Sequence, residues 1–164
     1  MRTTYIEKGI KNGKTISGEE KTVRLPFYNI SARALIIRRS DGAILGTLHR
    51  KGGQYALPGG AAEDDESPDE TVMRELEEEN IRLIGKDDHW QENIIVDYFK
   101  GYRSFAVWYL IPVDDVEVEE CDENIETRWV AQDEDVWYPL MRERILLEIQ
   151  RSIPELCRNC FKWA

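Results

Sequence analysis

The sequence is short of basic residues and of long apolar stretches, and each shortage excludes a class of protein. Lys and Arg number 22 against 32 Asp and Glu, which gives a formal net charge of −10 at pH 7. That balance disfavours nonspecific nucleic-acid binding, because such binding depends on neutralising phosphates with basic side chains. The longest apolar run, residues 105–113, falls well below the roughly 18 residues that span a bilayer. We therefore expect neither a nucleic-acid partner nor a membrane partner.

Cysteine is also scarce, with three residues in the chain: Cys121, Cys157 and Cys160. An odd count in a chain of this size is typical of a reducing compartment. The N-terminus shows neither the apolar segment of a secretory signal nor a lipidation motif, so the cytoplasm is the expected location. Cys157 and Cys160 form a lone C-x2-C pair, which indicates zinc only weakly because a structural site needs four ligands.

The remaining pattern predicts one α/β domain over residues 1–164. A length of 164 residues with 41% hydrophobic content is enough to bury one core. Residues 1–26 read as a peripheral hairpin around Asn12-Gly13, which would suit homodimer contacts. Alternating strands and two helices predict a sandwich around a central mixed sheet. The expected strands are 32–37, 43–48, 92–99, 104–113 and 126–131, the expected helices are 67–80 and 138–153, and 114–124 reads as an acidic linker.

The first helix has a marked start and a marked stop. Ser67 suits the N-cap, Pro68 the first helical position and Glu70 the third, which together form a capping box. Asn80 tolerates the left-handed conformation that closes a helix. The sequence therefore predicts a helix from Ser67 to Asn80.

Within this helix the stretch "RELEEEN", residues 74–80, sets four glutamates into five positions. Like charges at helical spacing are destabilising, and acids at a helix C-terminus oppose its dipole. At 100° per residue, Glu75, Glu78 and Glu79 share an arc of about 100° beside the apolar strip. That strip is formed by Val72, Met73 and Leu76. Converging carboxylates suit a hard divalent cation such as Mg²⁺, although an ordinary solvated acidic surface would carry the same charges.

The residues around this helix resemble the signature of the Nudix hydrolases, G-x5-E-x7-R-E-U-x-E-E-x-G-U with U aliphatic. The matching positions are Gly60, Glu66, Arg74, Glu75, Leu76, Glu78 and Glu79, and "LPGG" at 57–60 is similar to the usual lead-in. The late glycine of the signature falls on Ile81. A one-residue deletion, with Asn80 as the helix stop and Ile81 as the aliphatic residue, restores the match.

The resemblance implies a Nudix-like α/β/α sandwich and hydrolysis of a nucleoside diphosphate linked to another group, assisted by Mg²⁺ or Mn²⁺. By position, Glu75, Glu78 and Glu79 would be metal ligands and catalytic residues. Gly60 would offer a backbone carbonyl to the metal, and Arg74 would pair with Glu66 to orient the loop. Nucleoside triphosphates, nucleotide sugars and dinucleoside polyphosphates all fit the same signature.

Four further residues are candidates for binding a small-molecule nucleotide substrate. Arg50 and Lys51 lie in a basic triplet with His49 and could hold phosphate, although a solvated loop would have the same composition. Arg33 opens a central strand and could point into the cleft. Tyr98 lies where some relatives stack an aromatic side chain on the base, but an aromatic on an alternating strand is more often part of the core or of the sheet surface.

Two other functions stay open at this level. A catalytically silent nucleotide-binding or regulatory domain would use the same fold, and an acidic interaction protein would bind no metal through this helix. The acids of residues 119–126 lie where some relatives carry a further catalytic glutamate, without indicating which one would serve.

Overall fold

The computed structural model describes residues 3–11, 14–23, 29–50, 52–63, 65–99, 104–122, 124–131, 134–139 and 142. The element order is β1 (Thr3–Lys11), β2 (Lys14–Val23), β3 (Asn29–Arg38), β4 (Ile44–His49), β5 (Tyr55–Ala56), β6 (Gly59–Ala61), α1 (Pro68–Glu78), β7 (Ile81–Ile84), the short 3-10 helix η1 (Trp90–Glu92), β8 (Ile94–Phe99), β9 (Ser104–Val113), β10 (Asp115–Val118) and β11 (Asn124–Val130).

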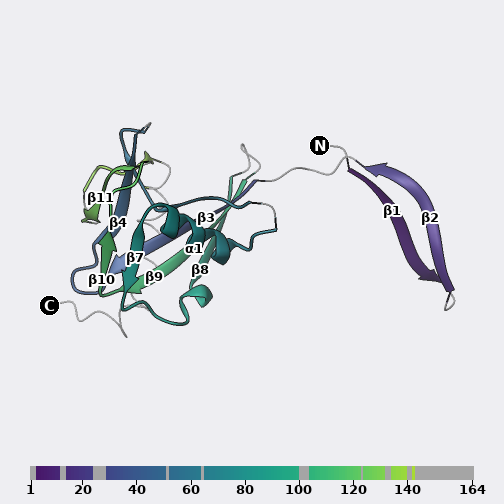
Figure 1. Ribbon diagram of the computed structural model, residues 1–164, viewed down its shortest axis with the longest axis horizontal. Helices are drawn as coiled ribbons and strands as arrows, with labels where there is room; N and C mark the ends of the chain where they lie inside the picture. Colours follow the sequence, from purple (N-terminus) through teal and green to yellow (C-terminus); the bar gives the residue numbers. More distant parts are fainter. Residues whose placement is uncertain are drawn as a thin grey trace.

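A mixed seven-stranded sheet forms the centre of the structure between β3 and β11 (Figure 1). Its strand order is β11-β4-β3-β9-β8, with β5 paired to β4 and β6 paired to β3. The β3 and β9 strands run parallel over their whole length, from the Asn29 and Ser104 pair to the Arg38 and Val113 pair. The other pairings in this sheet are antiparallel. The prediction of an α/β fold with a central mixed sheet is confirmed.

Both faces of β3 are buried, which explains why its sequence reads as a continuous apolar run. Alternate side chains enter two separate apolar clusters. The cluster on the side of α1 contains Ala32, Ala34, Ile36, Leu45, Val72, Leu76, Ile81, Trp90, Tyr109, Ile111 and Val113. The cluster on the opposite face contains Leu35, Ile37, Ile44, Tyr55, Leu57, Ala106, Trp108, Leu110, Val130 and Trp137.

A second, small sheet lies beside the end of α1 and was missed at the sequence level. In it β10 pairs antiparallel with β7, from the Asp115 and Ile84 pair to the Val118 and Ile81 pair. The run "DDVEVEE" looked like a linker because its acidic residues outnumber its apolar ones. The alternation of Val116 and Val118 with acids is nevertheless a strand pattern.

The α1 helix packs its apolar strip on the main sheet, with one exception to the prediction. Val72 and Leu76 are buried, whereas Met73 is 45% exposed. The third buried position of the helix is Thr71, which is fully buried. The buried face is thus rotated toward the loop that precedes the helix, so the expectation that Met73 faces the sheet was wrong.

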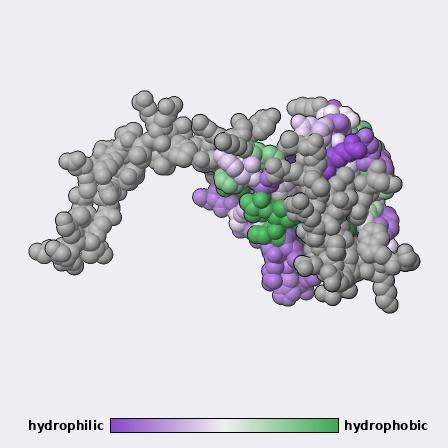
Figure 2. Space-filling model, turned by 180° about the vertical axis from the view of Figure 1, so that it is seen from behind, coloured by the Kyte–Doolittle hydropathy of each residue, from purple (hydrophilic) through white to green (hydrophobic). Residues whose placement is uncertain are grey.

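At the chain ends, the structure tests the expectations only in part. The β1 and β2 strands pair antiparallel, as the predicted hairpin requires, and their turn at Asn12-Gly13 lies outside the described residues. The expected helix over 138–153 also lies almost wholly outside them. No helix within the described ranges is long and apolar enough to cross a membrane. Viewed from behind, hydrophilic residues border a compact apolar area of the surface (Figure 2).

Candidate active site

The N-terminal end of α1 is closed by the capping box that the sequence predicts. The Ser67 hydroxyl accepts a hydrogen bond from the backbone N–H of Glu70, and the Glu70 carboxylate accepts one from the backbone N–H of Ser67. The buried Thr71 hydroxyl lies one position further on, 3.1 Å from the Glu66 carboxylate to which it donates. The capping box therefore satisfies the N–H groups of Ser67 and Glu70, and the Thr71 hydroxyl anchors the preceding loop.

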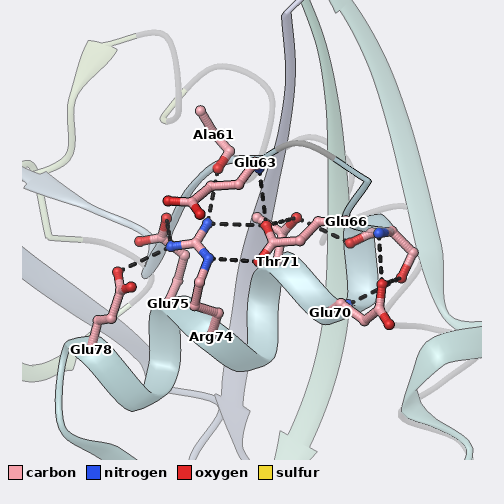
Figure 3. A network of polar contacts seen from close by, with 9 residues as sticks. Ala61, Glu63, Glu66, Glu70, Thr71, Arg74, Glu75 and Glu78 are labelled. Atoms are coloured by element: carbon pink, nitrogen blue, oxygen red, sulfur yellow. Dashed lines mark hydrogen bonds and ion pairs between the residues drawn. The ribbon is translucent and has the colours of Figure 1, made fainter.

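Arg74 joins this loop to the middle of the helix (Figure 3). Its guanidinium donates to Glu66 through Nε at 2.7 Å and through one terminal nitrogen at 3.2 Å. It also donates to the Ala61 carbonyl, to Glu75 and to Glu78, each at 3.0 Å. These five bonds use all five N–H groups of an arginine. The predicted pairing of Arg74 with Glu66 is present, and the same side chain reaches two of the expected metal ligands.

The pairing is reflected in the ionisation of both partners. The Arg74 guanidinium, together with the Glu63 backbone N–H, lowers the pKa of Glu66 to about 2. Conversely, the hydrogen bond to Glu66 raises the pKa of Arg74, helped by Glu75 and Glu78. The two side chains are therefore ionised together over the whole physiological range of pH.

Glu75 lies against the backbone of the strand that precedes the loop. A Cβ atom added to Gly60 would lie 2.0 Å from Glu75 Oε1, and one added to Gly59 would lie 2.3 Å from the Ala32 carbonyl oxygen. Gly59 also has φ +127°, a conformation that disfavours any other residue. The two glycines thus allow the strand, β3 and the Glu75 carboxylate to approach one another closely.

The C-terminal end of α1 carries a buried carboxylate. Glu79 is 2% exposed, and each of its oxygens accepts one hydrogen bond. The Gly59 backbone N–H lies 3.3 Å from Oε1, and the Asn124 side-chain nitrogen lies 3.1 Å from Oε2. Burial raises the pKa of Glu79 to about 7, although the donors from Gly59 and Asn124 oppose the shift. The helix wheel placed this carboxylate at the edge of the buried strip, and the structure buries it.

The helix stop also agrees with the prediction. Asn80 has φ +54° and the next residue, Ile81, is 6% exposed. Asn80 therefore takes the left-handed position and Ile81 the apolar one, as the deletion in the motif requires.

Arg33 lies beside these carboxylates. Its guanidinium donates to the Gly59 carbonyl oxygen. Burial lowers the pKa of Arg33, and the negative charges of Glu75 and Glu79 oppose that shift. A half-buried arginine next to two acids supplies positive charge where an anionic substrate would approach.

Of the other three expected substrate-binding residues, the structure describes Arg50 and Tyr98. Arg50 is exposed, and its Nε donates to the Asp122 carbonyl at 2.6 Å. Lys51 lies outside the described residues. Tyr98 pairs across the sheet with Phe105, whereas Arg33 is beside Trp108.

Side chains three positions apart on β9 point to opposite faces, so Tyr98 and Arg33 occupy different faces of the sheet. The ring of Tyr98 packs on Phe105 with 4.8 Å between centroids. The role of Tyr98 in substrate binding stays a prediction.

Asn124 belongs to this site although sequence reasoning missed it. The sequence pointed to the acids of residues 119–126, yet among the described residues of that segment it is the amide of Asn124 that contacts Glu79. Glu126 instead accepts a hydrogen bond from the Tyr55 hydroxyl. Glu119 and Glu120 are joined to Asn80 through backbone groups and the Asn80 side chain.

The donor set at this end of α1 fits a hard divalent cation. Carboxylate oxygens are the ligands that Mg²⁺ and Mn²⁺ prefer, and the Gly60 backbone leaves room for the Glu75 carboxylate. Within the described ranges, no three acidic, histidine or cysteine side chains are already gathered as a metal cluster. One terminal nitrogen of Arg74 donates to both Glu75 and Glu78, so it bridges the two carboxylates.

Comparisons with known proteins agree with the motif. The family model described as the NUDIX domain matches residues 20–145. A MutT-like protein from Streptomyces ambofaciens is 33% identical over 69 residues, which make up 42% of this chain and 44% of that protein.

Solved structures share the fold at low identity. A bifunctional NMN adenylyltransferase/ADP ribose pyrophosphatase from Francisella tularensis superposes with a TM-score of 0.60 at 22% identity, covering 77% of this chain and 42% of that one. A C. elegans Ap4A hydrolase superposes with a TM-score of 0.58 at 14% identity, covering 76% and 98%. The matches to the Streptomyces and Francisella proteins thus span less than half of each.

Proposed function

The chain belongs to the NUDIX domain family, and on this premise we propose that it hydrolyses a pyrophosphate bond in a nucleoside diphosphate derivative with the help of Mg²⁺ or Mn²⁺. The observation that carries the proposal is the buried Glu79 carboxylate, held by two donors beside Gly59. Burying a carboxylate is costly, so a carboxylate that is kept buried beside other acids is a candidate for a functional role. A cation shared with a diphosphate is a use that fits the family and the neighbouring acids.

In this proposal Glu75, Glu78 and Glu79 would hold the cation, and the Gly60 carbonyl would be a further ligand. When bound, the cation would neutralise the diphosphate and lower the pKa of a bound water. Arg74 holds the loop that carries Glu66 against the helix. Its hydrogen bonds to Glu75 and Glu78 also fix the positions of those two carboxylates before a cation binds. Catalysis of this kind depends mainly on positioning and on charge.

Arg33 is the proposed contact to substrate phosphate within the described site, because it is a cation beside Glu75 and Glu79. Arg50 and Lys51 stay proposals for binding substrate phosphate. The substrate class is proposed only as far as a nucleotide with a diphosphate. Triphosphates, nucleotide sugars and dinucleoside polyphosphates would be told apart by loops outside the signature.

A turnover assay tests the proposal. Nucleotide or phosphate release is measured with Mg²⁺ and with Mn²⁺ on nucleoside triphosphates, ADP-ribose and dinucleoside tetraphosphates, for the wild type, Glu79→Gln and Glu77→Gln. Glu77 is an exposed helix glutamate outside the proposed site, so it is the matched control. We expect Glu79→Gln to lower kcat by about 100-fold or more, as loss of a catalytic carboxylate typically does.

Glu77→Gln should keep wild-type turnover. Equal turnover in all three proteins would contradict the assignment of Glu79. Absence of turnover on every substrate, with a cation still bound, would favour a silent nucleotide-binding domain.

A further inference from the structure

Asn124 is placed by an irregularity in the edge strand β11. Asn124 is paired with His49 and Glu126 with Leu48, so Ile125 is an extra residue in the ladder. Ile125 is 61% exposed. Such a bulge shifts the alternation of side chains by one position, and bulges are frequent beside active sites.

The shift has a direct effect on where the neighbouring side chains point. Asn124 and Glu126 would share a face in a regular strand. In the structure the Asn124 amide donates to Glu79 at the end of α1, whereas Glu126 accepts from Tyr55, a member of the cluster on the opposite face. The bulge at Ile125 thus directs Asn124 toward the helix.

Asn124 is also unusual in its burial and its hydrogen bonding. The residue is 8% exposed, and within the described part of the chain its side-chain oxygen is buried without a hydrogen-bond partner. A buried polar atom of this kind calls for an explanation, because it has lost its hydrogen bonds to water and gained none within the protein. Asn124 also contributes to the wall of a cavity of about 430 Å³, together with Arg50, Glu119, Glu120 and Thr127.

We propose that Asn124 is a positioning residue that fixes the Glu79 carboxylate for the cation, with its free oxygen kept for a hydrogen-bond donor that arrives with the substrate complex. This rests on the proposed function of the site. The side-chain nitrogen and the Gly59 N–H each bond one oxygen of Glu79, so together they fix the plane of the carboxylate. Residues that orient a metal ligand in this way typically change metal affinity about 10- to 100-fold when lost.

The test is Mn²⁺ binding, measured by isothermal titration calorimetry on the full chain. The variants are Asn124→Leu, which keeps the approximate volume without the amide, and Asn124→Ala as a second variant in case leucine impairs folding. Thr127→Val is the matched control, because it is isosteric and lies on the same strand and cavity wall. We expect the Mn²⁺ Kd to rise about tenfold or more in both Asn124 variants and to stay unchanged in Thr127→Val.

A second readout separates positioning from a merely structural role. At saturating substrate, kcat of the Asn124 variants should recover toward the wild-type value as Mn²⁺ is raised above the new Kd, because the weakened affinity for the cation is then overcome. Loss of the free oxygen should remain visible as a raised KM for the substrate. A folding defect would lower turnover at every Mn²⁺ concentration, and that result would overturn the inference.

The controls also distinguish this inference from the function on which it rests. If the wild type binds Mn²⁺ and hydrolyses a substrate, Glu79→Gln does neither and the Asn124 variants match the wild type, the role of Asn124 alone is wrong. If the wild type neither binds Mn²⁺ nor turns over any substrate, both proposals fail together.

Discussion

The two ends of α1 carry the same kind of side chain in opposite environments. At the N-terminal end, Glu66 and Glu70 accept hydrogen bonds from Arg74, Ser67 and backbone groups, and the pKa of each is lowered. At the C-terminal end, Glu79 is buried and its pKa is raised to about 7. The first arrangement follows the rules of helix stability, whereas the second violates them.

The comparison distinguishes side chains that stabilise the helix from side chains that the helix places in the proposed site. A position at which such a local rule is broken is often a functional one. Substitutions at the first end should therefore act mainly on stability, and substitutions at the second end mainly on activity. Arg74 contacts carboxylates of both groups, so it is the place where the separation should break down.

Arg74→Lys should have the largest combined effect. Lysine keeps the charge but cannot make the five bonds of the guanidinium, so Glu66, Glu75 and Glu78 lose their fixed positions. We expect a loss of about 1.5–3 kcal/mol in the free energy of unfolding, the range for hydrogen bonds to charged groups. Turnover should fall as well. Urea unfolding and kcat measure the two effects, and Arg82→Lys, at an exposed ion pair with Glu117, should change neither.

Gly60→Ala should reduce activity with little effect on the fold. The added methyl group would meet the Glu75 carboxylate, which is the mobile end of a side chain and can move aside. Displacing a positioned group by about 1 Å can cost up to about 100-fold in rate, so we expect kcat to fall about 10- to 100-fold. Gly52→Ala, where the nearest atoms lie 3.8 Å from the new Cβ, is the control. Equal kcat in both variants would contradict the role of Gly60.

Ser67→Ala should act on stability alone. The serine hydroxyl accepts from the Glu70 N–H, and loss of such a cap typically costs about 1 kcal/mol. Ser67→Asp keeps an acceptor and should retain most of the stability. Thermal unfolding at equal protein concentration measures the stability of both variants. If kcat of Ser67→Ala fell by more than its folded fraction does, the cap would also affect activity, and the comparison between the two ends would be wrong.

Glu66→Gln sharpens the comparison through pH. The pKa of Glu66 is lowered in the folded protein, so its ionised form contributes stability above the unfolded value and that contribution disappears as pH falls through about 2. The stability difference between wild type and Glu66→Gln should therefore be constant near pH 7 and shrink between pH 4.5 and 2. A difference that grew on acidification would contradict the pairing with Arg74.

Much of the N-terminal end of α1 could be predicted from the sequence, because helix caps depend on residues that are close together in the sequence. Ser67, Pro68, Glu70 and Asn80 fixed the helix bounds through local rules, and strand periodicity located β3, β4, β8 and β9. The pairing of Arg74 with Glu66 followed from the resemblance to the Nudix signature. These features are set within a few residues along the chain.

The rest of the site depends on contacts between segments far apart in sequence. Asn124 reaches Glu79 across 45 positions through the bulge at Ile125, and no local pattern announces that bulge. The β10 strand was taken for a linker because of its acidic residues, and its pairing partner β7 lies more than thirty residues earlier in the sequence. Met73 was wrongly predicted to face the sheet, because a helical wheel does not show how the helix is rotated about its axis. In the structure this rotation buries Thr71 instead.

We propose that the buried Glu79 carboxylate binds a divalent cation. The most direct test is the thermal midpoint of the wild type and of Glu79→Gln at pH 8, each with and without Mg²⁺. At a concentration of 100 times Kd, binding adds about 2.7 kcal/mol of stability, which corresponds to a rise of several degrees.

Without Mg²⁺ we predict that Glu79→Gln is at least as stable as the wild type, because a buried amide costs less than a buried carboxylate. With Mg²⁺ the wild-type midpoint should rise while that of Glu79→Gln stays nearly constant. An equal rise in both proteins, or no rise in the wild type, would contradict the account.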